Sequence, residues 1–223
     1  MLSLLILINI YSYVLQAQCN QYYQIEDGTE WEIQNFNAKG KLTGTNKQKV
    51  TTFNKTSGGF EAIIHSVLVN DKGKQNMEGD LNFKCDGGTM YLDMRNFVSE
   101  DQMKAYKDFE MKIESENLEI PSTLTPGQTL KDASLLLTTV NAPFPMKLKI
   151  FITDRKVEGK ESITTPAGTF ECIKVTAKMS IQSIINANFS TIEWIAPKVG
   201  VVKTESYNKS GKLVGYSLLA RRT

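Results

Sequence analysis

The sequence predicts an all-β fold of about ten to twelve antiparallel strands with one short helix. Apolar and polar residues alternate with a period of two in many segments, and turn motifs rich in asparagine and glycine separate those segments. Only one segment has the signals of a helix. The chain has 223 residues, of which 41% are hydrophobic and 22% charged, as in an ordinary globular protein.

Alternation of apolar and polar side chains predicts the individual strands. Trp31 and Ile33 alternate with polar neighbours, and the same pattern recurs at residues 77–83, 109–114, 146–152 and 172–178. Such strands have one face on a core and the other in water. Phe60–Val69 and Ser134–Val140 are more continuously apolar, which predicts burial on both faces.

Three Asn-x-x-Gly motifs, each followed by lysine, predict tight hairpins. They begin at Asn37, Asn70 and Asn208. Asparagine at the first position and glycine at the fourth are typical of a type I turn that ends in a left-handed residue. Glycine suits that last position because it adopts positive φ without steric cost.

The expected helix runs from about Ser99 to Lys107. Ser99 is a capping residue, Gln102 follows it by three positions, and acidic residues occupy the first turn. No linker or low-complexity tract interrupts the rest of the chain. One domain over residues 18–223 is therefore the simplest organisation.

The first 17 residues are interpreted as a secretory signal peptide. They carry no charge, and their apolar run is shorter than the ~20 residues that span a bilayer. Two alternatives remain: an uncleaved membrane anchor, and a lipid attached at Cys19. Residues 18–223 would then form the mature domain.

An exported chain meets an oxidising compartment, where cysteines pair. Cys19 and Cys85 both have polar neighbours, whereas Cys172 lies in a strand-like run. We expect a disulfide between Cys19 and Cys85 that fastens the mature N-terminus to the domain; three free thiols are the alternative. Cys172 is not expected to be a nucleophile, because no neighbour in sequence lowers its pKa.

Composition and motifs argue against several functions. The net charge is +2, too weak to attract nucleic acid, and no Gly-rich phosphate loop or nucleophile elbow is present. We expect no metal and no cofactor: His65 is the sole histidine and is interpreted as structural, and the residues from Asp71 lack the further acids of a calcium loop. No catalytic residue stands out.

Aromatic residues are the remaining candidates for a ligand surface. Trp31, Trp194 and the pair Tyr22–Tyr23 could line one, although core packing is the usual role of such side chains. The sequence alone does not choose between these roles.

Several motifs resemble those of one family of exported bacterial proteins. They are Thr164–Val175 (TTPAGTFECIKV), Trp194–Lys203 (WIAPKVGVVK), Leu213–Leu218 (LVGYSL) and the stretch from Gly28 to Lys41. The chain is similar to the TapB-like family, which is related to domain of unknown function 3108. The resemblance implies an exported Gram-negative protein, periplasmic or associated with the outer membrane, whose single curved antiparallel sheet forms an open half-barrel. It implies no catalytic residue.

Three functions are consistent with this fold. The first is a non-enzymatic binding module whose concave sheet holds an apolar or lipid-like ligand. The second is a structural or interaction protein of the cell envelope that pairs through exposed edge strands. The third is a hydrolase built on two carboxylates. We expect the first, and therefore no enzyme activity, with a lipid or an envelope protein as the partner.

Overall fold

A computed structural model describes residues 19–98, 109–140, 142–143, 146–183 and 186–223. The elements in chain order are β1 Glu30–Asn37, β2 Leu42–Thr56, β3 Gly59–Asn70, β4 Gln75–Asp86, β5 Thr89–Leu92, the 3-10 helix η1 Met94–Phe97, β6 Glu110–Glu116, β7 Leu118–Ile120, β8 Ala133–Val140, β9 Lys147–Thr165, β10 Gly168–Gln182, β11 Ala187–Ala196, β12 Gly200–Asn208 and β13 Leu213–Arg222.

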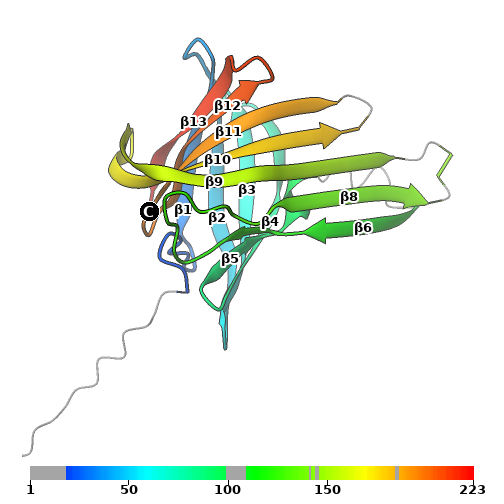
Figure 1. Ribbon diagram of the computed structural model, residues 1–223, viewed down its shortest axis with the longest axis horizontal. Coiled ribbons are helices and arrows are strands. Elements are labelled where there is room, and N and C mark those ends of the chain that lie inside the picture. The colour runs from blue at the N-terminus through cyan, green and yellow to red at the C-terminus, as the bar shows by residue number, and fades with distance from the viewer. Residues whose placement is uncertain (1–18, 99–108, 141, 144–145, 184–185) are drawn as a thin grey trace, which may run out of the picture.

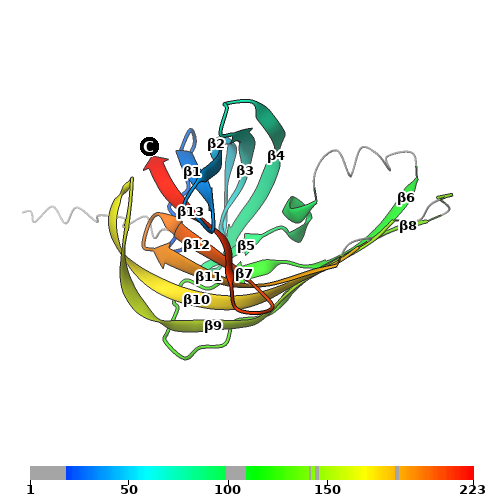
Figure 2. The same cartoon turned by 90° about the horizontal axis from the view of Figure 1, so that it is seen from above.

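All of these strands belong to one antiparallel sheet, which confirms the predicted fold class. The sheet has 13 strands in the order β6-β8-β9-β10-β11-β12-β13-β1-β2-β3-β4-β5-β7. Figure 1 shows the strands from one side, and Figure 2 shows them curving so that β1–β4 and β9–β12 form opposite walls. The result is a barrel that is nearly closed, with a seam between the two ends of the sheet.

The seam is bridged by the chain itself. β6 pairs with β8 at one end of the sheet, and β7 pairs with β5 at the other. Only Asn117 separates β6 from β7. One kinked run of chain therefore belongs to both ends of the sheet, while β6 and β8 extend beyond the barrel as a flap (Figure 1).

The three predicted Asn-x-x-Gly hairpins are confirmed, and they lie at the same end of the barrel. In each, the glycine N–H donates to the asparagine carbonyl, and Gly40, Gly73 and Gly211 have φ of 76°, 77° and 74°. The turns join β1 to β2, β3 to β4 and β12 to β13. Because every strand pair is antiparallel, these connections share one end of the sheet; we call it the open end.

The opposite end, the closed end, is filled by the segment that precedes β1. The predicted disulfide between Cys19 and Cys85 is present, so Cys19 has no free thiol for a lipid anchor. Asn20 is fully buried and donates to the carbonyls of Gly88 and Ile120, at 3.0 Å each. Tyr22 is buried beside it. The N-terminal segment is thus a plug fixed to three parts of the barrel.

Two apolar clusters stabilise this arrangement. The larger lies at the closed end and packs the plug against the starts of β1, β10 and β12, with Trp31, Ile173 and Val202 among its buried residues. The smaller lies under the flap, where Leu135 and Leu137 pack on Met94 of η1. Burying side chains of this size stabilises a fold by about 1.5–3 kcal/mol each.

Two expectations from the sequence are not met as stated. Ser134–Val140 and Phe60–Val69 are buried on one face only: Leu135 and Leu137 are buried, and the residues between them are half-exposed. The reason is that no second layer of described residues covers the outside of the sheet. The expected helix at Ser99–Lys107 lies largely outside the described residues, as does the expected signal peptide.

Candidate functional site

A cavity of about 600 Å³ opens at the same end of the barrel as the Asn-x-x-Gly turns. Its walls come from β1, β9, β10, β11, β12 and β13, and from η1 and β7. The wall side chains are mainly apolar, among them Phe97, Leu118, Val175, Ala177, Met179 and Phe189. This end of the barrel is hollow because its inward residues are smaller or more polar than those that pack the closed end.

Strand periodicity explains which side chains enter the cavity. On β10 the inward residues are Val175, Ala177 and Met179, and on β11 they include Phe189 and Glu193. Successive residues of a strand point to opposite faces, so every second residue reaches the cavity. The intervening residues lie on the outer face.

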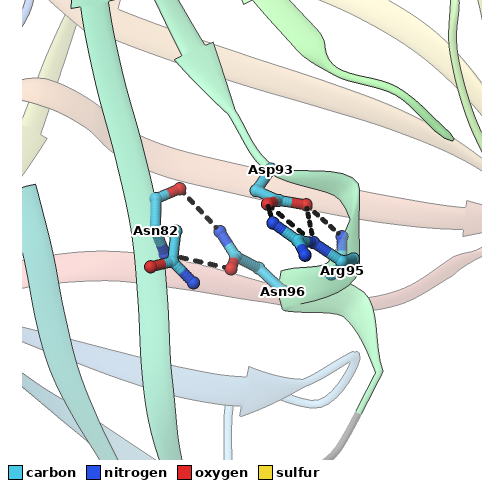
Figure 3. Close-up of polar contacts among 4 residues, drawn as sticks. All are labelled: Asn82, Asp93, Arg95 and Asn96. Carbon is cyan, nitrogen blue, oxygen red and sulfur yellow. Dashed lines mark hydrogen bonds and ion pairs between the residues drawn. The ribbon is translucent and has the colours of Figure 1, made fainter. Parts of the chain in front are cut away.

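η1 is held at the cavity mouth by two short polar contacts (Figure 3). The Asn96 side-chain oxygen accepts from the Asn82 backbone N–H at 3.0 Å, and its amide donates to the Asn82 carbonyl at 3.1 Å. Asn96 thus pairs with β4 as a further strand would. Asp93 caps η1 by accepting from the Arg95 N–H at 2.8 Å. Together these contacts place Phe97 in the wall of the cavity.

Arg155 forms part of the cavity floor because a β-bulge turns it inward. Leu148, Ile150 and Ile152 face the core, so simple alternation would place Arg155 outside. Asp154 adopts φ 51°, and the ladder shifts where Asp154 and Arg155 together oppose β10. A bulge of this kind reverses the facing of every later residue. Sequence reasoning missed Arg155 for this reason.

The Arg155 guanidinium joins the two sides of the seam. It donates to the Lys131 carbonyl at 2.5 Å and to the Glu119 carbonyl, on β7, at 2.9 Å. The side chain is only 4% exposed. Burial lowers the pKa of Arg155, and the nearby Glu193 carboxylate opposes that effect. Arg155 is therefore a cation whose donors are directed at main-chain carbonyls rather than at the cavity.

Glu193 is the one carboxylate among the described lining residues of the cavity. Burial raises its pKa above the ordinary 4.5, and the attraction of Arg155 only partly offsets this. Burial likewise raises the pKa of Tyr23, which the Glu193 charge raises further. No hydrogen bond to another described residue occupies the Glu193 carboxylate, so its oxygens are left to face the cavity.

Replacing Glu193 by glutamine tests this burial. Its pKa is raised on folding, so the wild-type side chain contributes fully below its unfolded pKa and loses stability as the pH rises through its folded pKa. We expect Glu193→Gln to raise the Tm by roughly 3 °C at pH 8, about 1 kcal/mol, with the gain shrinking toward pH 4.5. Thermal melts across this range measure it. Glu171→Gln, at an exposed site, is the control, and a gain independent of pH would contradict the assignment.

The other residues singled out from the sequence lie away from the cavity. Cys172 is buried at the closed end, where burial raises its pKa to about 11. His65 Nδ1 lies 2.9 Å from Asp80 Oδ1 on an exposed surface, and Asp71 forms an ion pair with Lys41 in the turns. Within the described ranges, no group of three or more His, Cys, Asp or Glu side chains is placed to hold a metal ion.

The aromatic candidates are structural. Trp194 is on the face of β11 opposite to Glu193, where its Nε1 donates to Glu161 at 2.9 Å and Lys203 lies 4.4 Å from the ring centre. Trp31 and Tyr22 are buried in the closed-end cluster. The cavity aromatics are instead Phe36, Phe97, Phe189 and Tyr216, which sequence analysis did not single out. In the part of the chain that the structure describes, no helix is long and apolar enough to cross a membrane.

Comparison with known proteins places the fold in a family. Two crystal structures resemble it over 92% of this chain and 100% of their own. One, an inferred exported protein with a YmcC-like fold from Bacteroides fragilis, has a TM-score of 0.73 at 23% identity. The other, an inferred lipoprotein from Parabacteroides distasonis, has a TM-score of 0.74 at 25% identity.

No curated protein matches the chain. The family model described as DUF3108-like matches residues 26–219, which include every strand of the barrel and all but the last residues of β13. The chain therefore belongs to the DUF3108-like family.

Proposed function

We propose that the protein is a non-enzymatic binding module that holds an apolar or lipid-like ligand in the barrel. The observation that carries the proposal is the cavity of about 600 Å³ with mainly apolar walls. Ligand sites are typically ~300–1,000 Å³ in volume and combine apolar walls with a few polar groups. A sheet that served only as a scaffold would gain stability by filling this space with larger side chains.

The floor of the cavity adds a polar feature to this site. Arg155 is occupied by carbonyls, whereas the Glu193 carboxylate faces the cavity. A hydroxyl or amine of a ligand that reaches the floor would donate to Glu193 and relieve an otherwise unpaired buried acceptor. The expected ligand is therefore mainly apolar with a hydrogen-bond donor.

The lining supports binding more than hydrolysis. Glycosidases use two carboxylates that lie about 5–10 Å apart across the substrate. The described lining of this cavity has Glu193 alone. A second acid, which such a reaction takes, would have to come from outside the described walls.

Filling the cavity tests the proposal. Ala177→Phe adds a ring where the β10 wall faces the cavity, and we expect at least ~10-fold weaker binding of a fluorescent fatty acid with little loss of stability. Ser180→Phe, on the opposite face of the same strand, is the matched control. Native mass spectrometry of protein purified from the cell envelope should show bound lipid on the wild type and less on Ala177→Phe. Equal binding by both variants would overturn the proposal.

One observation favours a second function, that of an interaction protein. β5 pairs only with Phe83–Asp86, so Gln75–Leu81 of β4 has no strand partner on that side among the described residues. An edge of this kind accepts an added strand from another chain. If wild-type protein carried no ligand and Ala177→Phe changed nothing, pairing through this edge would be the better explanation.

We also propose that the protein acts outside the cytoplasm, in the periplasm or at the outer membrane, with residues 1–17 as its signal peptide. The descriptions of the two similar structures as exported and lipoprotein support this, as does the disulfide, which persists in oxidising compartments. The motifs that resemble TapB-like proteins support a place in that branch of the family.

A further inference from the structure

Six lysines surround the mouth of the cavity. They come from the three Asn-x-x-Gly turns, and we call them the lysine rim: Lys39, Lys41, Lys72, Lys74, Lys209 and Lys212. All six are exposed. The ion pair between Lys41 and Asp71, at 3.6 Å, links the first turn to the second, and the stacked rings of Phe36 and Tyr216 link the first strand pair to the third.

The lysine rim is less neutralised than the walls of the barrel. Of its six members, only Lys41 forms an ion pair with a carboxylate of a described residue. On the walls, by contrast, lysines are commonly paired: Lys49 with Glu30 at 3.1 Å, and Lys131 with Glu119 at 2.8 Å. The protein has a net charge of only +2, so the excess positive charge is local to the open end.

Exposed apolar side chains gather at the same end. The large hydrophobic residues that are most exposed among those described are Met77 at 50%, Val214 at 46% and Phe97 at 37%. Phe97 and Val214 line the cavity, and Val214 follows Lys212 by two residues. Met77 lies near the start of β4, three residues beyond Lys74. The nearby acids Glu78 and Asp80 are engaged by Gln75 and His65.

We propose that the open end of the barrel docks on the surface of a bilayer that contains anionic lipid. Lysines at a surface are attracted to anionic headgroups, and apolar side chains between them enter the headgroup boundary. The pattern of unpaired lysines interleaved with exposed apolar residues has this complementarity, whereas the closed end does not. Docking would place the cavity mouth against the bilayer, so that a lipid could pass between them. This inference rests on the proposed lipid-binding function for its purpose but not for its test.

The test measures binding of the full chain to vesicles by co-sedimentation. Vesicles of phosphatidylcholine with 30% phosphatidylglycerol are compared with vesicles of phosphatidylcholine alone. We expect tighter binding to the anionic vesicles, and loss of the difference at high salt because surface charges are then screened. The variant Lys72→Gln/Lys209→Gln/Lys212→Gln should bind the anionic vesicles on the order of 100-fold more weakly.

The matched control removes the same charge at the closed end. Lys55, Lys160 and Lys198 lie there without an ion pair to a described carboxylate, and Lys55→Gln/Lys160→Gln/Lys198→Gln should bind as the wild type does. Every variant has the same residues 1–18, so any contribution from them cancels. Equal weakening by both triple variants, or equal binding to both vesicle types, would overturn the docking proposal.

Two further measurements separate docking from ligand binding. The variant of the lysine rim should still bind a soluble fluorescent fatty acid, because its cavity is unchanged. Ala177→Phe should still bind anionic vesicles, because its rim is unchanged. If Ala177→Phe fails to weaken fatty-acid binding, the proposed function fails; if the rim variant keeps its vesicle binding, the docking surface fails.

Discussion

Arg155→Met is expected to lower the free energy of unfolding by about 3 kcal/mol, the largest effect of any single side chain named here apart from the disulfide. The substitution removes two charge-assisted hydrogen bonds, to the carbonyls of Lys131 and Glu119, and leaves both carbonyls in an apolar setting. It also removes the cation nearest to the buried Glu193. Methionine keeps most of the volume, so the loss reports the polar contacts rather than a cavity.

Chemical denaturation of Arg155→Met and wild type measures the difference. Lys156→Met changes the neighbouring exposed residue and should cost less than ~0.5 kcal/mol. The double variant with Glu193→Gln should cost less than the sum of the two single changes, because the uncompensated carboxylate is then absent. Strict additivity, or an effect equal to that of Lys156→Met, would show that Arg155 does not join the seam.

Removing the disulfide is the second large change. Cys19 and Cys85 are 66 residues apart, and cross-linking a loop of that length stabilises by roughly 4 kcal/mol in the chain-entropy model. We expect Cys85→Ala to lose most of that stability and to free the plug, so that hydrogen exchange at Asn20 and Tyr22 becomes faster. Reduction of the wild type should have the same effect.

Cys172→Ala is the control for this experiment. Cys172 is buried and unpaired, so its replacement should cost only about 1 kcal/mol and leave the plug protected from exchange. Loss of plug protection in Cys172→Ala as well would mean that the closed end depends on general packing rather than on the cross-link.

Local sequence signals account for most of the barrel. The strands follow from alternation, the three hairpins from Asn-x-x-Gly, and the disulfide from the polar neighbours of Cys19 and Cys85. In each case, the signal lies within a few residues of the feature that it predicts. The burial expected for Ser134–Val140 was wrong because composition does not reveal whether a second layer covers a strand.

The cavity could not be predicted in the same way. Its lining joins Asn35 on β1 to Ser217 on β13, and no local pattern shows that these strands are neighbours. Arg155 enters the floor through a bulge, and the positive φ of Asp154 is its structural sign. Aspartate is one of the few residues that tolerate this conformation, so an Asp inside a strand pattern is the weak signal that could have suggested it.

The pairing of β1 with β13 has a consequence for biogenesis. Nearly all other neighbours in the sheet are close in sequence, whereas this ladder joins Trp31 to Arg222. Contacts of such long range form late, because the loop between them must first be ordered. During translocation from the N-terminal end, β1 would wait with an unpaired edge until β13 had crossed, and in that interval the nascent chain would depend on periplasmic chaperones.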